Sequence, residues 1–123
     1  MMYNSLVTAY FFEPKHVGTI EPSVFSRCLH QQSSTSNCNF SLAASIDRQS
    51  NFDRACFKAK GSPFLIAGLE YICETLEGTN LDSHPSISYE QLVEVLALPR
   101  TNYAIAVLME EAYRKLILMF KNA

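Results

Sequence analysis

Signatures of common catalytic and nucleotide-binding sites are missing from this sequence of 123 residues. It has four glycines, which form neither a GxGxxG fingerprint nor a Walker loop, so a phosphate-binding loop of either kind is excluded. GxSxG and HExxH motifs are absent, and no pair of carboxylates lies inside an apolar segment. Glu110 and Glu111 begin the exposed side of a predicted helix, where a solvated face is the simpler interpretation than acid–base catalysis. We therefore expect that the protein is not an enzyme.

Features of nucleic-acid and membrane proteins are also missing. Ten basic and twelve acidic residues are spread along the chain and give a net charge of −2, so no basic stripe predicts nucleic-acid binding. The longest apolar runs, such as YAIAVLM at 103–109, are too short to span a bilayer. No Lys or Arg precedes Lys15, and the first residues lack an uninterrupted apolar segment, so no signal peptide is expected. We expect a cytoplasmic protein that binds neither nucleic acid nor membranes.

No two cysteines form a CxxC pair, which disfavours a zinc ribbon or a thioredoxin-like dithiol. The four cysteines are Cys28, Cys38, Cys56 and Cys73, separated by 10, 18 and 17 positions. In a cytoplasmic chain the expected state of all four is the reduced thiol. Cys73 falls on the apolar stripe of a predicted helix and Cys56 on a predicted strand, and we interpret both as packing residues.

What is present is the pattern of one α+β domain covering residues 1–123, with no internal repeat and no long linker. Apolar residues at three- and four-residue spacing predict helices over 2–12, 62–77, 88–96 and 102–120. Alternating stretches joined by short polar connections predict strands over 23–31, 38–46 and 52–60. Consecutive strands with short connections form antiparallel sheets. We therefore expect a three-stranded antiparallel sheet with helices packed on one face.

The stretch GSPFLIAG at 61–68 joins a predicted strand to a predicted helix. Ser62 is a favourable N-cap residue, and Pro63 suits the first helical position. Gly78 suits the left-handed residue that ends the same helix. Ser88, with Gln91 three residues later, gives a second capping signal.

Four stretches in this order resemble the NifU/IscU-type iron–sulfur cluster scaffold over nearly the entire chain. They are YFFEPKHVGTIEP, SNCNFSL, DRACFKAKGSPFLIAGLEYICETLEG and LALPRTNYAIAVLMEEAYRKLI. The resemblance implies the same α+β sandwich. It also implies a task in iron–sulfur cluster assembly, in which such scaffolds take sulfur from a cysteine desulfurase and hold a [2Fe–2S] cluster at one end of the fold.

The family's site uses three cysteines, an aspartate and a histidine, and most of these ligands are replaced here. The first cysteine matches Cys38, and the aspartate two residues later falls on Phe40. The second cysteine falls on Ser62. The histidine–cysteine pair falls on Ala104 and Ile105. Of the family's Leu-Pro-Pro-Val-Lys chaperone-recognition stretch, only Leu98 and Pro99 survive, followed by Arg100-Thr101-Asn102.

Because most ligands are replaced, we do not expect this chain to bind a cluster as members of the family do. One thiolate supplies neither the ligand number nor the charge balance that a cluster needs. We expect no stoichiometric cofactor, and iron, zinc or an iron–sulfur cluster would need ligands shared between subunits. The resemblance then implies a role through contacts with a cysteine desulfurase or another iron–sulfur assembly protein, with Cys38 as the remaining cofactor-binding position.

An alternative is chemical: Cys38 accepts persulfide sulfur, or binds a metal with Cys28 and His30. If the first hairpin turns near Ser34, His30 lies opposite Cys38 and Cys28 lies diagonally on the same face. Water or a second subunit would supply the fourth metal ligand. The competing interpretation is a core cysteine beside a surface histidine, and a slip of one residue in register would separate the three side chains.

Overall fold

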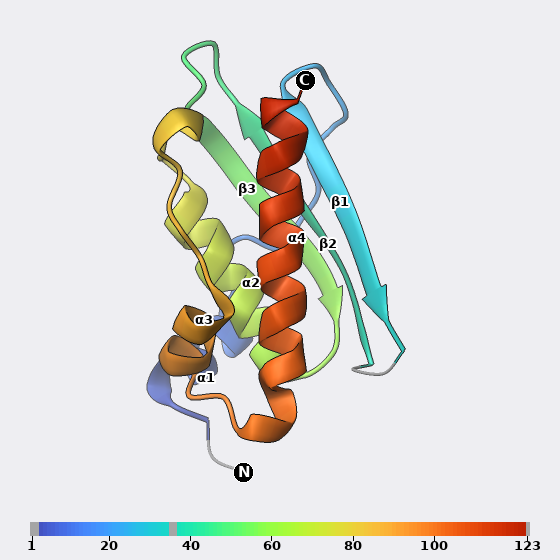
Figure 1. The fold of residues 1–123 in the computed structure, drawn as a ribbon, viewed down its shortest axis with the longest axis vertical. Helices are drawn as coiled ribbons and strands as arrows, with labels where there is room; N and C mark the ends of the chain where they lie inside the picture. The colour runs from blue at the N-terminus through green and yellow to red at the C-terminus, as the bar shows by residue number, and fades with distance from the viewer. Residues whose placement is uncertain (1–2, 35–36, 123) are drawn as a thin grey trace.

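In the computed structural model, which describes residues 3–34 and 37–122, three strands and four α-helices form two layers (Figure 1). The strands are β1 (Ser26–Ser33), β2 (Cys38–Ile46) and β3 (Phe52–Lys60). The helices are α1 (Ser5–Phe12), α2 (Pro63–Leu76), α3 (Tyr89–Leu96) and α4 (Tyr103–Lys121), with short 3₁₀ turns η1 (Leu81–Ser83) and η2 (Arg100–Asn102). β1 begins and ends later than the strand predicted at 23–31. Met2 of the predicted first helix lies outside the described residues.

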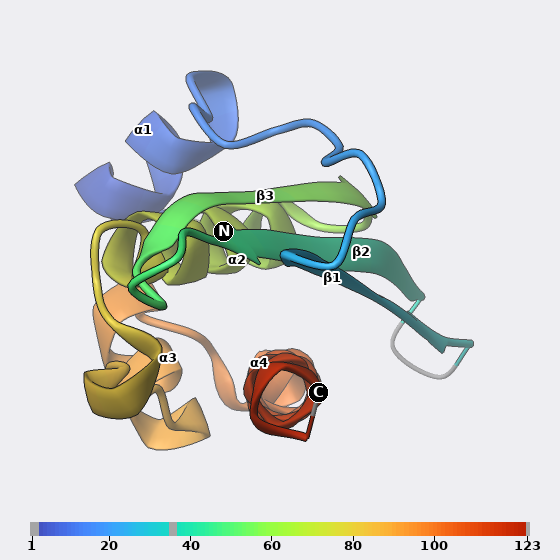
Figure 2. The same ribbon diagram turned by 90° about the horizontal axis from the view of Figure 1, so that it is seen from above.

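The sheet is antiparallel with the order β1–β2–β3, as predicted. Helices α2 and α4 cover one of its faces, which we call the helix face (Figure 2). The apolar residues of this face and of the helices, α3 included, form one buried core. Its largest fully buried side chains are Phe40, Phe52, Phe57, Leu42, Leu65, Leu69, Ile72, Leu76, Leu92, Leu96, Met109 and Leu116. The expected α+β fold is confirmed.

The last helix is fastened to the first strand. Nε of Arg27 on β1 donates a hydrogen bond to the carbonyl of Met119 on α4 at 3.2 Å. The same guanidinium lies 5.6 Å from the ring centroid of Phe120, within the range of a cation–π contact. The helix face of β1 is therefore closed by a segment that lies far along the chain.

Segment 14–25 connects α1 to β1 on the other side of the sheet. His16 and Gly18 exchange backbone hydrogen bonds with Phe57 at 2.9 Å, and Val17 forms a parallel bridge with it, so the segment lies along the free edge of β3. Figure 2 shows it then passing over the face of the sheet opposite α4, which we call the outer face. In the described part of the chain, no helix is long and apolar enough to cross a membrane.

Candidate functional site

Three segments that carry positions matched to the family's ligands lie at one end of the molecule. The β1–β2 hairpin, the turn from β3 into α2 and the start of α4 lie together at this end (Figure 1). Cys38 begins β2, Ser62 precedes α2, and Ala104 lies in the first turn of α4. The fold therefore brings to one end the segments that carry the positions matched to the family's ligands.

A hollow of about 610 Å³ opens at this end beside Cys38. Residues of the hairpin and of the β3–α2 turn line it: Gln32, Ser33, Ser34, Asn37, Cys38, Asn39, Lys60 and Gly61. The Cys38 side chain itself is part of the core, since this residue is 2% exposed. Burial raises the pKa of its thiol, so the thiol keeps its proton at neutral pH and is a weak nucleophile in this conformation.

Ser62 starts α2, and its predicted capping role is confirmed. Its backbone is extended, and its hydroxyl accepts a hydrogen bond from the Leu65 amide at 3.4 Å. Pro63 follows in the first helical turn, where the missing N–H costs nothing. Ser62 therefore satisfies one of the unpaired amides of the helix end.

Replacing Ser62 with alanine is expected to lower the free energy of unfolding by about 0.5–2 kcal/mol, because the cap is lost. No change in bound metal is expected. Urea denaturation followed by circular dichroism gives the first quantity and metal analysis gives the second. Loss of iron or zinc without loss of stability would assign Ser62 to a metal site.

The other replaced positions divide between core and surface. Phe40 is 1% exposed and Ile105 is 5% exposed, so both belong to the core. Ala104 is exposed on the first turn of α4. Two of the four replacements therefore contribute apolar packing where the family has polar or ionisable ligands.

The expected register of the first hairpin is wrong. His30 pairs with Ser41, Cys28 with Ala43, and Cys38 with Ser33. The predicted pairing is displaced by three positions from the observed one, because the hairpin turns closer to β2 than expected. Since an odd displacement exchanges the two faces of a strand, Cys38 faces the helices while Cys28 and His30 face outward. This register removes the geometric basis for a site built from Cys28, His30 and Cys38.

Cys56 and Cys73 lie where the sequence places them. Cys56 pairs with Ala43 on the outer face and is 2% exposed, and Cys73 is fully buried in α2. Burial raises the pKa of both thiols, for Cys73 well above its usual value. No group of three His, Cys, Asp or Glu side chains able to hold a metal ion occurs within residues 3–34 and 37–122.

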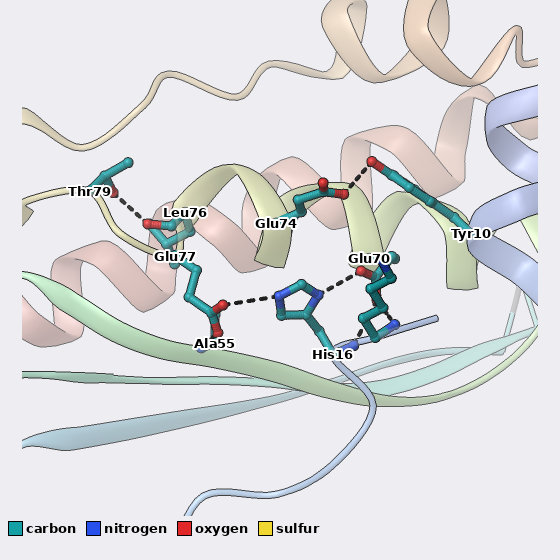
Figure 3. Close-up of polar contacts among 9 residues, drawn as sticks. Tyr10, His16, Ala55, Glu70, Glu74, Leu76, Glu77 and Thr79 are labelled. Atoms are coloured by element: carbon teal, nitrogen blue, oxygen red, sulfur yellow. Dashed lines mark hydrogen bonds and ion pairs between the residues drawn. The ribbon is translucent and has the colours of Figure 1, made fainter. Parts of the chain in front are cut away.

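A partly buried polar cluster that the sequence did not predict holds segment 14–25 against α2 (Figure 3). One carboxylate oxygen of Glu70 accepts the backbone N–H groups of Lys15 and His16, both at 2.9 Å. The other lies 2.6 Å from Nδ1 of His16. Nε2 of His16 lies 3.2 Å from Glu77, whose second oxygen accepts the Ala55 amide of β3. The imidazole thus bridges the carboxylates of Glu70 in α2 and of Glu77, the residue that caps the end of this helix.

These contacts favour the charged imidazole. Burial disfavours the imidazolium of His16, but the hydrogen bonds and negative charges of Glu70 and Glu77 outweigh it, and the pKa of His16 is raised above its usual 6.5. Tyr10 of α1 hydrogen-bonds Glu74 of the same helix. Burial and this carboxylate raise the pKa of Tyr10 to about 12. The His16–Glu70 and Tyr10–Glu74 contacts hold the first part of the chain against α2.

The stability contributed by His16 is expected to depend on pH. A raised pKa in the folded state gives stability that is fully present below the unfolded pKa of 6.5 and is lost as pH rises through the folded pKa. Thermal unfolding across this range should show wild type losing stability at higher pH. The His16→Gln variant should lack that part of the slope, and an unchanged slope would contradict the assignment.

Sequence reasoning had one signal for this cluster. Glu70 and Glu77 are seven residues apart on the predicted helix 62–77 and so share a helix face, and Glu70 lies beside its apolar stripe. A carboxylate at that place needs a partner. The partner, His16, comes from a segment more than fifty residues away, which no local pattern identifies.

Comparison with known proteins agrees with this geometry. The fold is that of an α+β scaffold domain, and the model of the NifU-like N-terminal domain family matches residues 2–123. The chain belongs to this family. It is 26% identical over 127 aligned positions to the iron–sulfur cluster assembly scaffold protein IscU of Buchnera aphidicola subsp. Baizongia pistaciae, covering 99% of this chain and 98% of that protein.

Solved structures share the fold at low sequence identity. A crystal structure from Fervidobacterium islandicum, described as a scaffold for iron–sulfur cluster assembly in the SUF system, matches with a TM-score of 0.73 and 13% identity, covering 94% of this chain and 96% of that one. The N-terminal part of a NifU-like protein from Brucella abortus matches with a TM-score of 0.67 and 11% identity, covering 97% and 94%. Family membership and fold are therefore both established.

Proposed function

We propose that this protein serves iron–sulfur cluster assembly through protein–protein contacts and does not itself carry a cluster in the monomer. The single observation that supports this most is the composition of the end that holds Cys38. At the positions matched to family ligands, one buried thiol is accompanied by Phe40, Ser62, Ala104 and Ile105. A cluster ordinarily takes four protein ligands, usually thiolates, and these replacements provide none.

Anaerobically purified protein is expected to contain far less than one cluster per chain. The measurement is iron and acid-labile sulfide per chain after reconstitution with ferrous iron and sulfide, together with the visible absorption spectrum. Cys38→Ser is the control for residual binding, and Cys73→Ser is the matched control at a fully buried thiol. Charge-transfer bands at near one cluster per chain would contradict the proposal. Bands found only in a dimer would mean that two subunits share the ligands.

The partner we propose is a cysteine desulfurase or another protein of the assembly pathway. Family membership supports this partner class, and the Leu98-Pro99 pair of the family pattern is retained immediately before η2 and α4. Binding of purified protein to a desulfurase from the same organism can be measured by biolayer interferometry. Tyr103→Ala and Val107→Ala, both exposed on the first turns of α4, should weaken binding. Leu118→Ala, exposed near the other end of the helix, is the matched control.

A second candidate function is sulfur acceptance at Cys38, supported by the hollow that opens beside it. The Cys38 thiolate would attack the terminal sulfur of a donor persulfide. That step breaks the donor's S–S bond, forms a new one on Cys38 and leaves a thiolate on the donor. Because the thiol is buried with a raised pKa, the step requires partner binding to expose it. Mass spectrometry after incubation with a persulfurated desulfurase should find one extra sulfur, which Cys38→Ser abolishes.

A further inference from the structure

Basic residues are concentrated on the outer face of the sheet, where strand pairing brings together residues that are separated along the chain. Four side chains of β3 point to this face, Arg54, Cys56, Lys58 and Lys60, and three of them are basic. Across the strands, Lys58 continues a row with Ser41 and His30, and Lys60 continues a row with Asn39 and Gln32. Neither row contains a carboxylate.

Acidic residues are correspondingly scarce in the sheet. No Asp or Glu occurs between Glu21 and Asp47, nor between Asp53 and Glu70. Eight of the twelve acidic residues follow position 69, where the chain forms helices and their connections: Glu70, Glu74, Glu77, Asp82, Glu90, Glu94, Glu110 and Glu111. The net charge of −2 therefore combines a basic sheet face with acidic helices.

Two positive charges lie close together on the outer face. Lys58 and Lys60 are exposed on the same face of β3, about 7 Å apart along the strand. The ion pairs of residues 3–34 and 37–122 involve His16 and Arg114 and neither of these lysines. Like charges on one sheet face repel. A negatively charged partner would remove this repulsion.

A hollow of about 510 Å³ lies on this half of the outer face. Its lining combines His30, Asn39, Ser41, Lys58 and Lys60 with Val17 at the edge of β3 and with Phe40 and Ala59. Val17 is 55% exposed, which gives the hollow an apolar margin beside its basic groups. In the neighbouring row of the sheet, Ala43 and Cys56 are buried. The solvent-exposed part of this half of the outer face is therefore confined to the rows of Lys58 and Lys60.

We infer that this surface, formed by Val17, His30, Asn39, Ser41, Lys58 and Lys60, docks an acidic peptide segment of a partner protein. Carboxylates of the segment pair with Lys58 and Lys60, amide and hydroxyl groups of Asn39 and Ser41 hydrogen-bond it, and an aliphatic side chain covers Val17. The inference does not rest on the function proposed above, although this surface adjoins the hollow beside Cys38 and shares Asn39 and Lys60 with it. Its basic area is small, with Lys58 and Lys60 as its permanent charges, and could neutralise only a few phosphates, which favours a peptide over a nucleic acid.

The test is fluorescence anisotropy with a short labelled peptide in which glutamate alternates with valine. Wild type should bind it, with an affinity that falls as salt is added. Reversing both charges with Lys58→Glu and Lys60→Glu should weaken binding about tenfold or more. The matched control makes the same charge change with Lys115→Glu and Lys121→Glu on α4, both exposed, and should leave the affinity nearly unchanged. Thermal unfolding establishes that both double variants are folded.

Amide chemical shifts recorded during the titration locate the contact. The proposal expects the largest changes at Ser41, Lys58 and Lys60. Equal weakening by the two double variants, shifts on the helices, or no binding of the peptide at millimolar concentration would overturn it. A single-stranded oligonucleotide is titrated in parallel. Tighter binding of the oligonucleotide at the same amides would identify a nucleic-acid site and overturn the peptide proposal.

Discussion

Phe40→Asp is expected to lower the free energy of unfolding by about 5 kcal/mol or more, enough to leave most molecules unfolded. Removing a buried phenylalanine side chain costs about 3–5 kcal/mol, and burying an unpaired carboxylate adds to that. Phe40 is 1% exposed within the helix-face core. The variant would introduce the aspartate that the family pattern has at this position. The loss in free energy of unfolding therefore measures how strongly the fold now depends on an apolar side chain at position 40.

Urea denaturation followed by circular dichroism gives the measurement, since the chain contains no tryptophan for fluorescence. Phe40→Leu is the packing control and should cost much less. Ser62→Cys, which introduces a second family ligand at a half-buried helix cap, should change stability by about 1 kcal/mol or less. A Phe40→Asp protein as stable as Phe40→Leu would mean that position 40 borders water.

Glu70→Ala is expected to cost about 3 kcal/mol. The change leaves the Lys15 and His16 amides and the His16 imidazole without their shared acceptor, and three donors left unsatisfied in a partly buried place destabilise the fold. Glu74→Ala, one turn further along α2, is the matched control. Glu74 is exposed and binds the Tyr10 hydroxyl, so its loss should cost about 1 kcal/mol or less.

Hydrogen exchange distinguishes this effect from general loosening of the core. In Glu70→Ala the amides of His16 and Gly18 should exchange much faster, because the segment is no longer held along β3. The amides of β2 should change only with the overall stability. Equal destabilisation by the two glutamate variants would show that the buried carboxylate has no special role.

Local patterns in the sequence were sufficient for most of the fold. The caps at Ser62 and Ser88 were predicted and confirmed, because a capping hydroxyl acts within three residues of its own position. The fold class and the order of elements were also confirmed, since apolar periodicity decides which face of each element is buried.

The candidate site was less predictable, because it depends on register and on distant contacts. The β1–β2 register decides whether Cys38 shares a face with Cys28 and His30, and the polar run between the strands fits several turns equally well. His16 and Glu70 meet only because segment 14–25 lies along β3. The basic outer face is likewise produced by strand pairing, which aligns residues that are spread along the chain.

The attachment of α4 to β1 has a consequence for synthesis on the ribosome. Arg27 and its acceptor Met119 are separated by 92 positions, so translation at about 5–20 residues per second leaves roughly 5–18 s between their appearances. During that time α4 is not available to cover the apolar helix face of β1 and β2. The apolar side chains on the helix face of β1 and β2 therefore stay uncovered until α4 has been synthesised, and exposed apolar surface of this kind makes an incomplete chain prone to aggregation.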